Sequence, residues 1–252
     1  MVNAADLKTV NDTNKICKYA DDTYLIIPAS SEHTRSHELS NTEAWAQRNN
    51  LNINRSKCHE MVCYNSRKRI EITPPPETHG ITRVNSMNIL GVLLTEQLSF
   101  SDHVTNKINS CAQSMYALKI LRHKGMKRDI LHNIFKAVIL SRLTYGSPTW
   151  SGFLTTNDSK RIETFLERCI KFVFYADKHT TFAGLCDTID NRLFLSILNN
   201  NNHLLHHFLP PASAALESYD LRPRKHNREL PKTTSNLGRR NFITRILLAD
   251  AY

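Results

Sequence analysis

KYADDTYLIIP, residues 18–28, places two acids side by side between two short apolar runs. The flanking residues 16–20 and 23–27 are rich in aromatic and β-branched side chains, which favour strands. Asp is common in turns, and Pro28 removes a donor from any strand ladder. The stretch therefore predicts a β-hairpin with Asp21 and Asp22 at its tip.

The neighbouring carboxylates need an explanation, because two such groups about 4 Å apart repel each other by a few kcal/mol at an intermediate dielectric. The acids can turn into water, one of them can bind a proton, or a divalent cation can sit between them and other acids. Mg²⁺ binds a few carboxylates together with substrate phosphates, and paired ions of this kind serve phosphoryl transfer. A bare Asp-Asp pair, taken alone, favours the solvent-facing turn.

The composition is that of a globular protein with a basic surface. The 252 residues are 40% hydrophobic and 22% charged, and 33 Lys and Arg against 23 Asp and Glu give a net charge of +10. Such a surplus suits a polyanionic partner, although a merely soluble basic protein is the alternative. Glycine is scarce, and neither G-x-G-x-x-G nor G-x-x-x-x-G-K occurs, so the sequence excludes the common phosphate-binding loops.

Cysteine usage and the N-terminus bear on localisation. The six cysteines form no C-x-x-C pair, which indicates free thiols in a reducing compartment. The start lacks the basic-then-apolar order of a signal peptide, and no apolar run has the length of a membrane span. We expect an intracellular protein, cytoplasmic or nuclear, that is neither secreted nor in a membrane.

The first part of the chain mixes helix and strand signals. A polar helix is predicted over residues 31–48, ending at Asn49-Asn50. Its few apolar members would lie along one side: Leu39, Trp45 and Ala46. Strands are predicted over residues 60–64 and 89–94, and the isolated Gly91 in the second indicates a bulge or a close backbone approach.

After residue 100 the hydrophobic period lengthens from two residues to about three and a half, which indicates helices. The helical stripes are Val104, Ile108, Cys111, Met115 and Leu118; then Ile130, Leu131, Ile134, Phe135, Val138 and Ile139; then Ile162, Phe165, Leu166, Cys169, Ile170 and Val173. Asn157 or Asp158 would cap the last of these helices. A further helix over residues 192–208 would stop at Pro210-Pro211, and a short one would hold the apolar residues of 242–248. The fold class is α+β.

The wider sequence resembles the reverse transcriptases of non-LTR retrotransposons of the LINE or jockey type. Tyr19, Ala20, Asp21 and Asp22 match the family's Tyr-x-Asp-Asp hairpin position by position. Similar stretches follow in order: ELSNTEAWAQRNNLNINRSK (38–57), RVNSMNILGVLLTEQLSF (83–100), LTYGSPTW (143–150) and NLGRRNFITRIL (236–247). The Tyr-Ala-Asp-Asp core is the most specific of these motifs, and the succession covers nearly the whole chain.

The resemblance implies an architecture with three parts. Residues 1–98 would be a partial polymerase palm, made of the acid-bearing hairpin with a helix and short strands. Residues 99–185 would form a helical thumb-like region, and residues 186–252 a helical, basic C-terminal region. Because a palm hairpin normally lies against neighbours that bury its faces, we expect the helical half to be the better packed part.

The resemblance also implies roles for individual residues. Asp21 would be a catalytic metal ligand, and Asp22 would support the same metal site. Tyr19 would pack near the primer terminus, and Lys57 would lie near the incoming nucleotide, where it could neutralise leaving pyrophosphate. Ile89-Leu90-Gly91, in the family's strand pair, would position the primer strand.

The implied reaction is template-directed nucleotidyl transfer with two Mg²⁺ ions, or Mn²⁺ in their place, in the intact enzyme. Its partners would be an RNA template, a DNA primer and nucleoside triphosphates. The family's centre also uses a third carboxylate, in an aromatic-x-Asp pattern well upstream of the hairpin. Asp6 and Asp12 lie too close to the hairpin to match it, and a two-acid site should hold paired ions weakly.

We therefore expect an RNA-directed DNA polymerase fragment that is inactive alone. The alternative is a basic, non-catalytic nucleic-acid-binding remnant of a transposon, and an open reading frame without function is a third interpretation. Cations of the C-terminal tail are candidates for contact with a nucleic-acid backbone, although a solvated charge run would look the same. These candidates are Arg222, Arg224, Lys225, Arg228, Arg239, Arg240 and Arg245. Trp45 and Trp150 are predicted as core anchors rather than base-stacking platforms.

Overall fold

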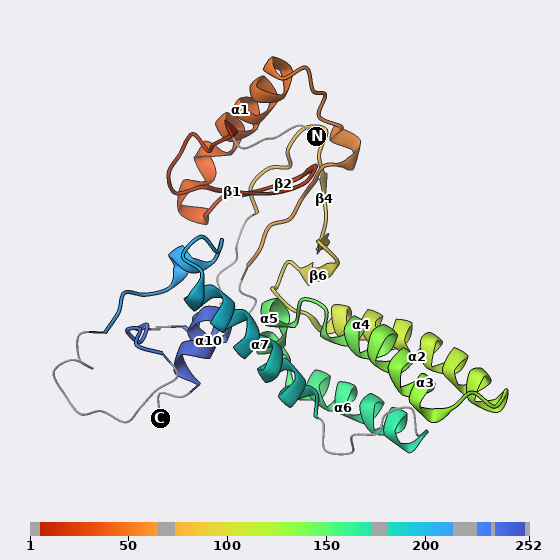
Figure 1. Ribbon diagram of the computed structural model, residues 1–252. Coiled ribbons are helices and arrows are strands. Elements are labelled where there is room, and N and C mark those ends of the chain that lie inside the picture. Colours follow the sequence, from red (N-terminus) through yellow and green to blue (C-terminus); the bar gives the residue numbers. More distant parts are fainter. Residues whose placement is uncertain (1–5, 65–73, 173–180, 214–225, 233–234, 250–252) are drawn as a thin grey trace. The chain divides into compact units, whose positions relative to one another are not determined.

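The computed structural model describes residues 6–64, 74–172, 181–213, 226–232 and 235–249 (Figure 1). The chain divides into two compact units, residues 1–85 and 86–252, and each is described by itself. Small sheets and many helices make the fold α+β, as predicted. The assignment of its parts to a palm and a thumb stays a prediction.

The elements of the first unit are strands β1 (Lys15–Tyr19) and β2 (Asp22–Ile26), the 3₁₀ helix η2 (Ala29–Thr34), helix α1 (Arg35–Arg48), the 3₁₀ turn η3 (Arg55–Lys57), and strands β3 (His59–Glu60) and β4 (Thr82–Arg83). β1 and β2 pair antiparallel, and β3 and β4 pair parallel. The predicted hairpin is confirmed, but its turn lies one residue earlier than predicted: Ala20 and Asp21 stand between the strands, and Asp22 belongs to β2, opposite Tyr19.

The predicted helix of the first unit is confirmed as η2 running into α1. It ends where expected, because the Asn49 N–H bonds the carbonyls of Trp45 and Ala46 while Asn50 takes a left-handed φ of 55°. The strand predicted over residues 60–64 is wrong beyond Glu60. The strand β3 ends at Glu60, and its partner β4 is likewise two residues long.

Apolar support in the first unit is slight. Its buried cluster consists of Leu7, Trp45 and Ala46, with Ile16 and Leu51 packed against it. The second unit has the larger core, so the expectation that the helical half packs better is confirmed. The buried members of this core come from α2, α3, η4, α4, α5, α6 and α7, together with Phe100 just before α2.

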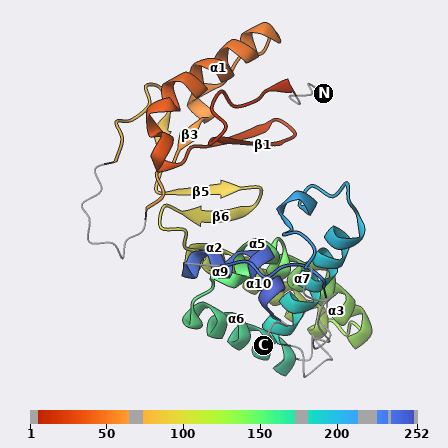
Figure 2. The ribbon, with the colours of Figure 1, turned by 90° about the vertical axis from the view of Figure 1, so that its left-hand side faces the viewer.

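The elements of the second unit are strands β5 (Ser86–Ile89) and β6 (Val92–Thr95); helices α2 (Ser101–His123) and α3 (Arg128–Ile134); the π-helix η4 (Phe135–Leu140); α4 (Ser141–Thr144) and α5 (Ser147–Trp150); the 3₁₀ turn η5 (Ser151–Phe153); α6 (Thr156–Lys171) and α7 (Phe182–Asn199); the 3₁₀ turn η6 (His206–Phe208); and α9 (Asn236–Arg240) and α10 (Phe242–Leu248). Figure 2 shows the β5–β6 ribbon preceding these helices. None of the described helices combines the length and apolar character that a bilayer span requires.

The predicted stripes form the core, with one exception. Val104, Phe135 and Phe165 are fully buried, whereas Ile130 and Val138 of the second stripe are exposed, which makes that stripe narrower than predicted. The three predicted stripes lie on α2, on α3 with η4, and on α6, and the short helix predicted over residues 242–248 is α10. Val173 lies outside the described residues. Both tryptophans are core residues, as predicted, with exposed fractions of 9% for Trp45 and 1% for Trp150.

Three boundaries in the second unit differ from the predictions. Residues 89–94 are a hairpin rather than one strand, because Leu90 and Gly91 both adopt positive φ and reverse the chain. Helix α7 begins ten residues before the predicted start at residue 192, since the Thr181 side chain caps it, and it ends at Asn199 before an extended Asn200. Helix α6 is capped by Thr155 rather than by Asn157 or Asp158.

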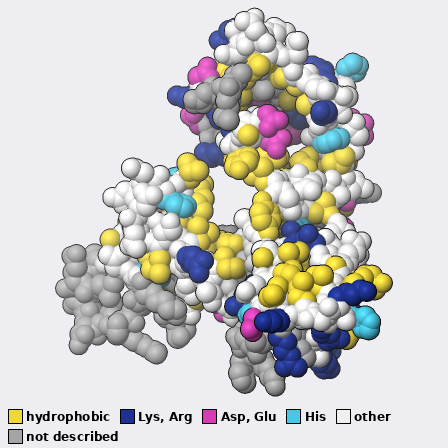
Figure 3. All heavy atoms as spheres, turned by 45° about the vertical axis from the view of Figure 1, so that its right-hand side comes forward, with side chains coloured by type: hydrophobic (Ala, Val, Ile, Leu, Met, Phe, Trp, Pro, Cys, Tyr) yellow, Lys and Arg dark blue, Asp and Glu magenta, His cyan; other side chains and the backbone are white. Residues whose placement is uncertain are grey.

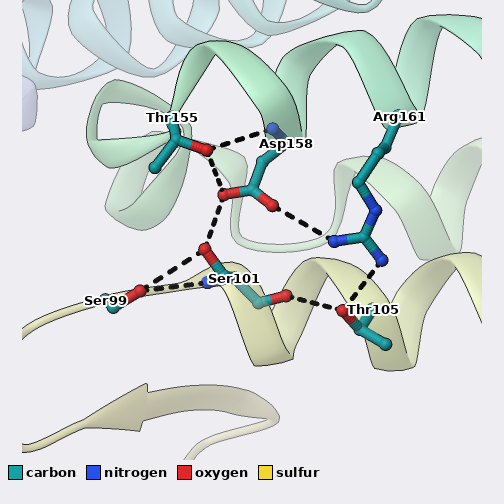
Figure 4. Close-up of polar contacts among 6 residues, drawn as sticks. All are labelled: Ser99, Ser101, Thr105, Thr155, Asp158 and Arg161. Carbon is teal, nitrogen blue, oxygen red and sulfur yellow. Dashed lines mark hydrogen bonds and ion pairs between the residues drawn. The ribbon is translucent and has the colours of Figure 1, made fainter.

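A buried carboxylate joins the first turns of α2 and α6 (Figure 4). Asp158 is 2% exposed, and its Oδ2 accepts hydrogen bonds from the hydroxyls of Ser101 and Thr155, both at 2.7 Å. The Arg161 guanidinium lies 3.3 Å from Oδ1 and also donates to the Thr105 hydroxyl at 2.9 Å. Burial alone would raise the pKa of Asp158, but these hydroxyl donors and the Arg161 charge outweigh it, so the net pKa is lowered.

Asp158→Asn should destabilise the second unit by about 2 kcal/mol at neutral pH, because the strong hydrogen bonds to a charged group disappear. A lowered folded pKa means that this stability is present above the unfolded Asp pKa of about 4 and is lost as the pH falls through the folded value. Urea unfolding followed by circular dichroism measures both effects. Asp129→Asn, at an exposed first-turn Asp of α3, is the matched control; an equal loss in both variants would contradict the prediction.

Candidate functional site

Asp21 lies in the turn of the β1–β2 hairpin and Asp22 is the first residue of β2, and the backbone of this turn is strained. Ala20 has a φ of 52°, a left-handed conformation that costs a non-glycine residue about 1–2 kcal/mol. Asp21 follows it in the turn, and Asp22 opens β2 opposite Tyr19. Both acids are exposed. The strand pairing thus fixes the backbone positions of the two aspartates.

The donor chemistry of this turn fits a hard cation. Both side chains offer carboxylate oxygens, the ligands Mg²⁺ prefers, and one of them is oriented by a neighbour: the Tyr24 hydroxyl donates to Asp22 Oδ2 at 3.3 Å. Within the described residues, no group of three or more His, Cys, Asp or Glu side chains is arranged to hold a metal ion. Asp21 and Asp22 therefore fit as two ligands of a site, rather than as a complete one.

The hairpin is held at its root by a buried acid that the sequence did not single out. Glu38 of α1 is 0% exposed and accepts hydrogen bonds from the backbone N–H groups of Val10 and Asn11 and from Asn14 Nδ2, at 2.8–3.1 Å. Asn14, itself 1% exposed, also donates to the Thr34 hydroxyl at 2.9 Å. Because Lys15 starts β1, these bonds fix the chain as it enters the acid-bearing hairpin.

The electrostatics of Glu38 follow from these hydrogen bonds. Burial by itself would raise its pKa, but the donors on Asn11, Asn14 and Val10 stabilise the charged form more strongly, so the net pKa is lowered. The nearby His37 lowers the pKa further. Glu38 therefore works as a charged acceptor inside the unit.

The other predicted site residues of the first unit lie in the open. Tyr19 is 64% exposed at the end of β1. Lys57 is exposed at the end of η3. In the part of the chain that the structure describes, the side chains of Tyr19 and Lys57 form no hydrogen bond or ion pair with the two aspartate carboxylates.

Ile89, Leu90 and Gly91 lie in the second unit, at the tip of the β5–β6 hairpin. Ile89 ends β5 opposite Val92, and Leu90 and Gly91 form the turn with φ values of 48° and 84°. The close backbone approach predicted for Gly91 is confirmed, because a Cβ there would lie 3.2 Å from the Tyr145 ring.

The comparisons with known proteins agree with these motifs. The sequence is 28% identical, over 168 aligned residues, to the "Probable RNA-directed DNA polymerase from transposon X-element" of Drosophila melanogaster. The chain is related to a transposon reverse transcriptase. The resemblance to non-LTR retrotransposon polymerases drawn from the hairpin and its following motifs is thereby confirmed.

The match covers 63% of this chain but only 18% of the Drosophila polymerase. No protein-family model matches the chain, and no solved structure matches it. The activity and partners of a whole polymerase therefore remain proposals for this chain.

The cations predicted to contact a nucleic-acid backbone divide into three groups. Arg222, Arg224 and Lys225 lie outside the described residues. Arg239 and Arg240 are exposed on α9. Arg228 and Arg245 face protein acceptors: Arg228 Nη1 donates to the Pro210 carbonyl at 3.2 Å, and Arg245 Nη2 lies 2.8 Å from Asp190 Oδ2. Figure 3 shows further Lys and Arg side chains over the helices of the second unit, beside hydrophobic ones.

Glu38→Gln should weaken the first unit by about 2 kcal/mol at neutral pH, because the amide cannot replace a charged acceptor and brings its own N–H groups toward donors. Hydrogen exchange of peptides from residues 10–26 measures the loss. The folded pKa of Glu38 is lowered, so the wild type gains this stability above the unfolded Glu pKa of about 4.3 and loses it as the pH falls through the folded value.

The difference between wild type and Glu38→Gln should consequently shrink on acidification. Glu43→Gln, at a more exposed acid of the same helix, serves as the control. A difference that stays constant between neutral and acidic pH would contradict the assignment of Glu38 as a charged acceptor.

Proposed function

We propose that this chain is the portion of a transposon reverse transcriptase that carries the paired aspartates of the palm, followed by the thumb and a basic C-terminal region. The relation to an RNA-directed DNA polymerase supports this assignment. The observation that carries it is the two-residue turn at Ala20 and Asp21, which presents both acids to solvent within a matching Tyr-Ala-Asp-Asp hairpin. The free thiols of the chain suit the cytoplasm or the nucleus.

In this proposal Asp21 and Asp22 hold Mg²⁺, or Mn²⁺, at the nucleotidyl-transfer centre. A bound ion of this kind stabilises the charge that develops on the transferring phosphoryl oxygens. Lys57 neutralises the leaving pyrophosphate, and Tyr19 contacts the primer terminus. Ile89, Leu90 and Gly91 hold the primer strand, with an RNA template, a DNA primer and nucleoside triphosphates as partners.

We further propose that the chain does not polymerise by itself. The described residues offer two carboxylates at the turn and no third acid grouped with them. Two carboxylate ligands alone do not hold two metal ions in the geometry that in-line phosphoryl transfer demands. The chain then contributes binding of a primer–template and a metal ligand pair, and the remaining acid must come from another segment.

The metal assignment predicts a specific effect of Asp21→Asn. Binding of a DNA primer annealed to a longer RNA template should tighten with Mg²⁺ in the wild type, and the variant should lose about tenfold of that gain, ~1.4 kcal/mol. Fluorescence anisotropy with and without Mg²⁺ measures this, alongside primer extension, which we expect to be absent.

Asp12→Asn removes an equal charge from an exposed position of the same unit and is the control. Extension by the wild type that Asp21→Asn abolishes would overturn the proposed inactivity and establish a complete polymerase. A Mg²⁺ effect that is equal in all three proteins would remove the metal site from the turn.

A second candidate function is non-catalytic binding of nucleic acid by a transposon remnant, and the exposed Arg239 and Arg240 favour it. The double variant Arg239→Gln, Arg240→Gln should bind nucleic acid with a weaker salt dependence. The negative slope of log binding constant against log salt concentration should become shallower by about 1 for each phosphate that an arginine no longer neutralises. Lys160→Gln, at an exposed cation of α6, is the matched control. An unchanged slope in the double variant would exclude α9 from the binding surface.

A further inference from the structure

The tip of the β5–β6 hairpin is gripped by one side chain from a distant part of the second unit. Tyr145 lies between α4 and α5, and its hydroxyl donates a hydrogen bond to the Leu90 carbonyl at 3.0 Å. The edge of its ring lies against Gly91, where an added Cβ would approach Cε1 to 3.2 Å. Only a glycine at position 91 leaves room for the ring without a shift.

Two further contacts hold Tyr145 in place, one to its ring and one to its backbone. The Lys107 ammonium of α2 lies 5.0 Å from the ring centroid, within the range of a cation–π contact. The Tyr145 carbonyl accepts a hydrogen bond at 3.0 Å from the indole N–H of Trp150, which is 1% exposed in the core. Tyr145 therefore connects the hairpin tip to the buried Trp150 of the core.

The hairpin is anchored again lower down, on β6. The Leu93 N–H donates to His103 Nδ1 at 3.1 Å, and His103 is 2% exposed on α2. The tip has no comparable burial, since Leu90 is 40% and Tyr145 53% exposed. The hydroxyl bond and the ring contact thus add to the Ile89–Val92 strand pair in holding a turn that lies in solvent.

This turn needs such support. Leu90 has a φ of 48°, a conformation that residues with a side chain rarely adopt, and Gly91 follows at 84°. Strained backbone of this kind persists where its surroundings hold it, and it clusters at binding sites. Tyr145 gives the Leu90 carbonyl a hydrogen-bond partner in this conformation, in addition to the strand pairing on either side of the turn.

We propose that Tyr145 is a positioning residue for the primer strand: it fixes the Leu90–Gly91 turn in the conformation that receives the primer. The inference rests on the proposed function, which assigns Ile89, Leu90 and Gly91 to the primer. Tyr145 acts through the turn, and the Leu90 carbonyl it engages is oriented by the bond.

Two variants of the full chain test this. Tyr145→Phe removes the hydroxyl bond and keeps the ring, and Gly91→Ala forces the ring and the turn apart. The probes are a DNA primer annealed to a longer RNA template, with a recessed 3′ end, and a blunt RNA–DNA duplex of the same paired length. Tyr116→Phe, at a tyrosine that is 66% exposed on α2, is the matched control.

Tyr145→Phe should reduce the preference for the recessed end by about two- to tenfold, the range for one neutral hydrogen bond. Binding of the blunt duplex and the thermal midpoint should stay at wild-type values. Hydrogen exchange of the peptide covering residues 86–95 should rise in both test variants and not in Tyr116→Phe. Because both changes act on one turn, the double variant should lose no more than the more affected single variant.

The outcomes separate the inference from the proposed function. Unchanged exchange in Tyr145→Phe, or a wild-type end preference that survives it, would overturn the positioning role while leaving the primer assignment intact. A wild type without any preference for the recessed end would overturn the primer assignment, and with it the role of Tyr145, even if exchange rises.

Discussion

The carboxylate of Glu38 is the group on which the acid-bearing hairpin depends. The first unit buries few apolar side chains, so hydrophobic packing alone does not determine that β1 starts at Lys15. A buried charge without partners would cost several kcal/mol, and here the backbone of Val10 and Asn11 supplies the donors. Those bonds fix the chain before the strand, the strand register fixes the turn, and the turn fixes the aspartates.

The second unit solves the same problem in the opposite way. A continuous helical core holds this unit together, and the β5–β6 hairpin is bonded to the exposed Tyr145 at its tip and to the buried His103 on β6. Asp158 accepts hydrogen bonds from two hydroxyls and pairs with one arginine, so polar contacts join the N-terminal turns of α2 and α6. Hydrogen bonds to an ionised side chain therefore organise the first unit, whereas an apolar core organises the second.

The hairpin, α1 and the helical stripes could be predicted from local sequence patterns, because hydrophobic periodicity and turn residues are local properties. The patterns failed at helix ends, where several neighbouring residues could serve: Thr155 caps α6 rather than Asn157 or Asp158, and α7 ends at Asn199, well before the prolines. For the candidate site, the aspartates and Gly91 were predicted from the motif and the family resemblance, and their roles stay predictions. Glu38 and Tyr145 were not predicted, since an acid in a polar helix and a tyrosine after a helix carry no signal of what they will meet.

The tryptophans give the architecture an optical consequence. The sequence holds two of them, and each lies in the core of a different unit. The Trp150 indole donates to the Tyr145 carbonyl in a nearly closed environment, whereas Trp45 is 9% exposed in a small cluster. Each half of the molecule thus carries its own intrinsic fluorophore, and a difference in emission or quenching between the indoles would report the melting of the two halves independently, without an added label.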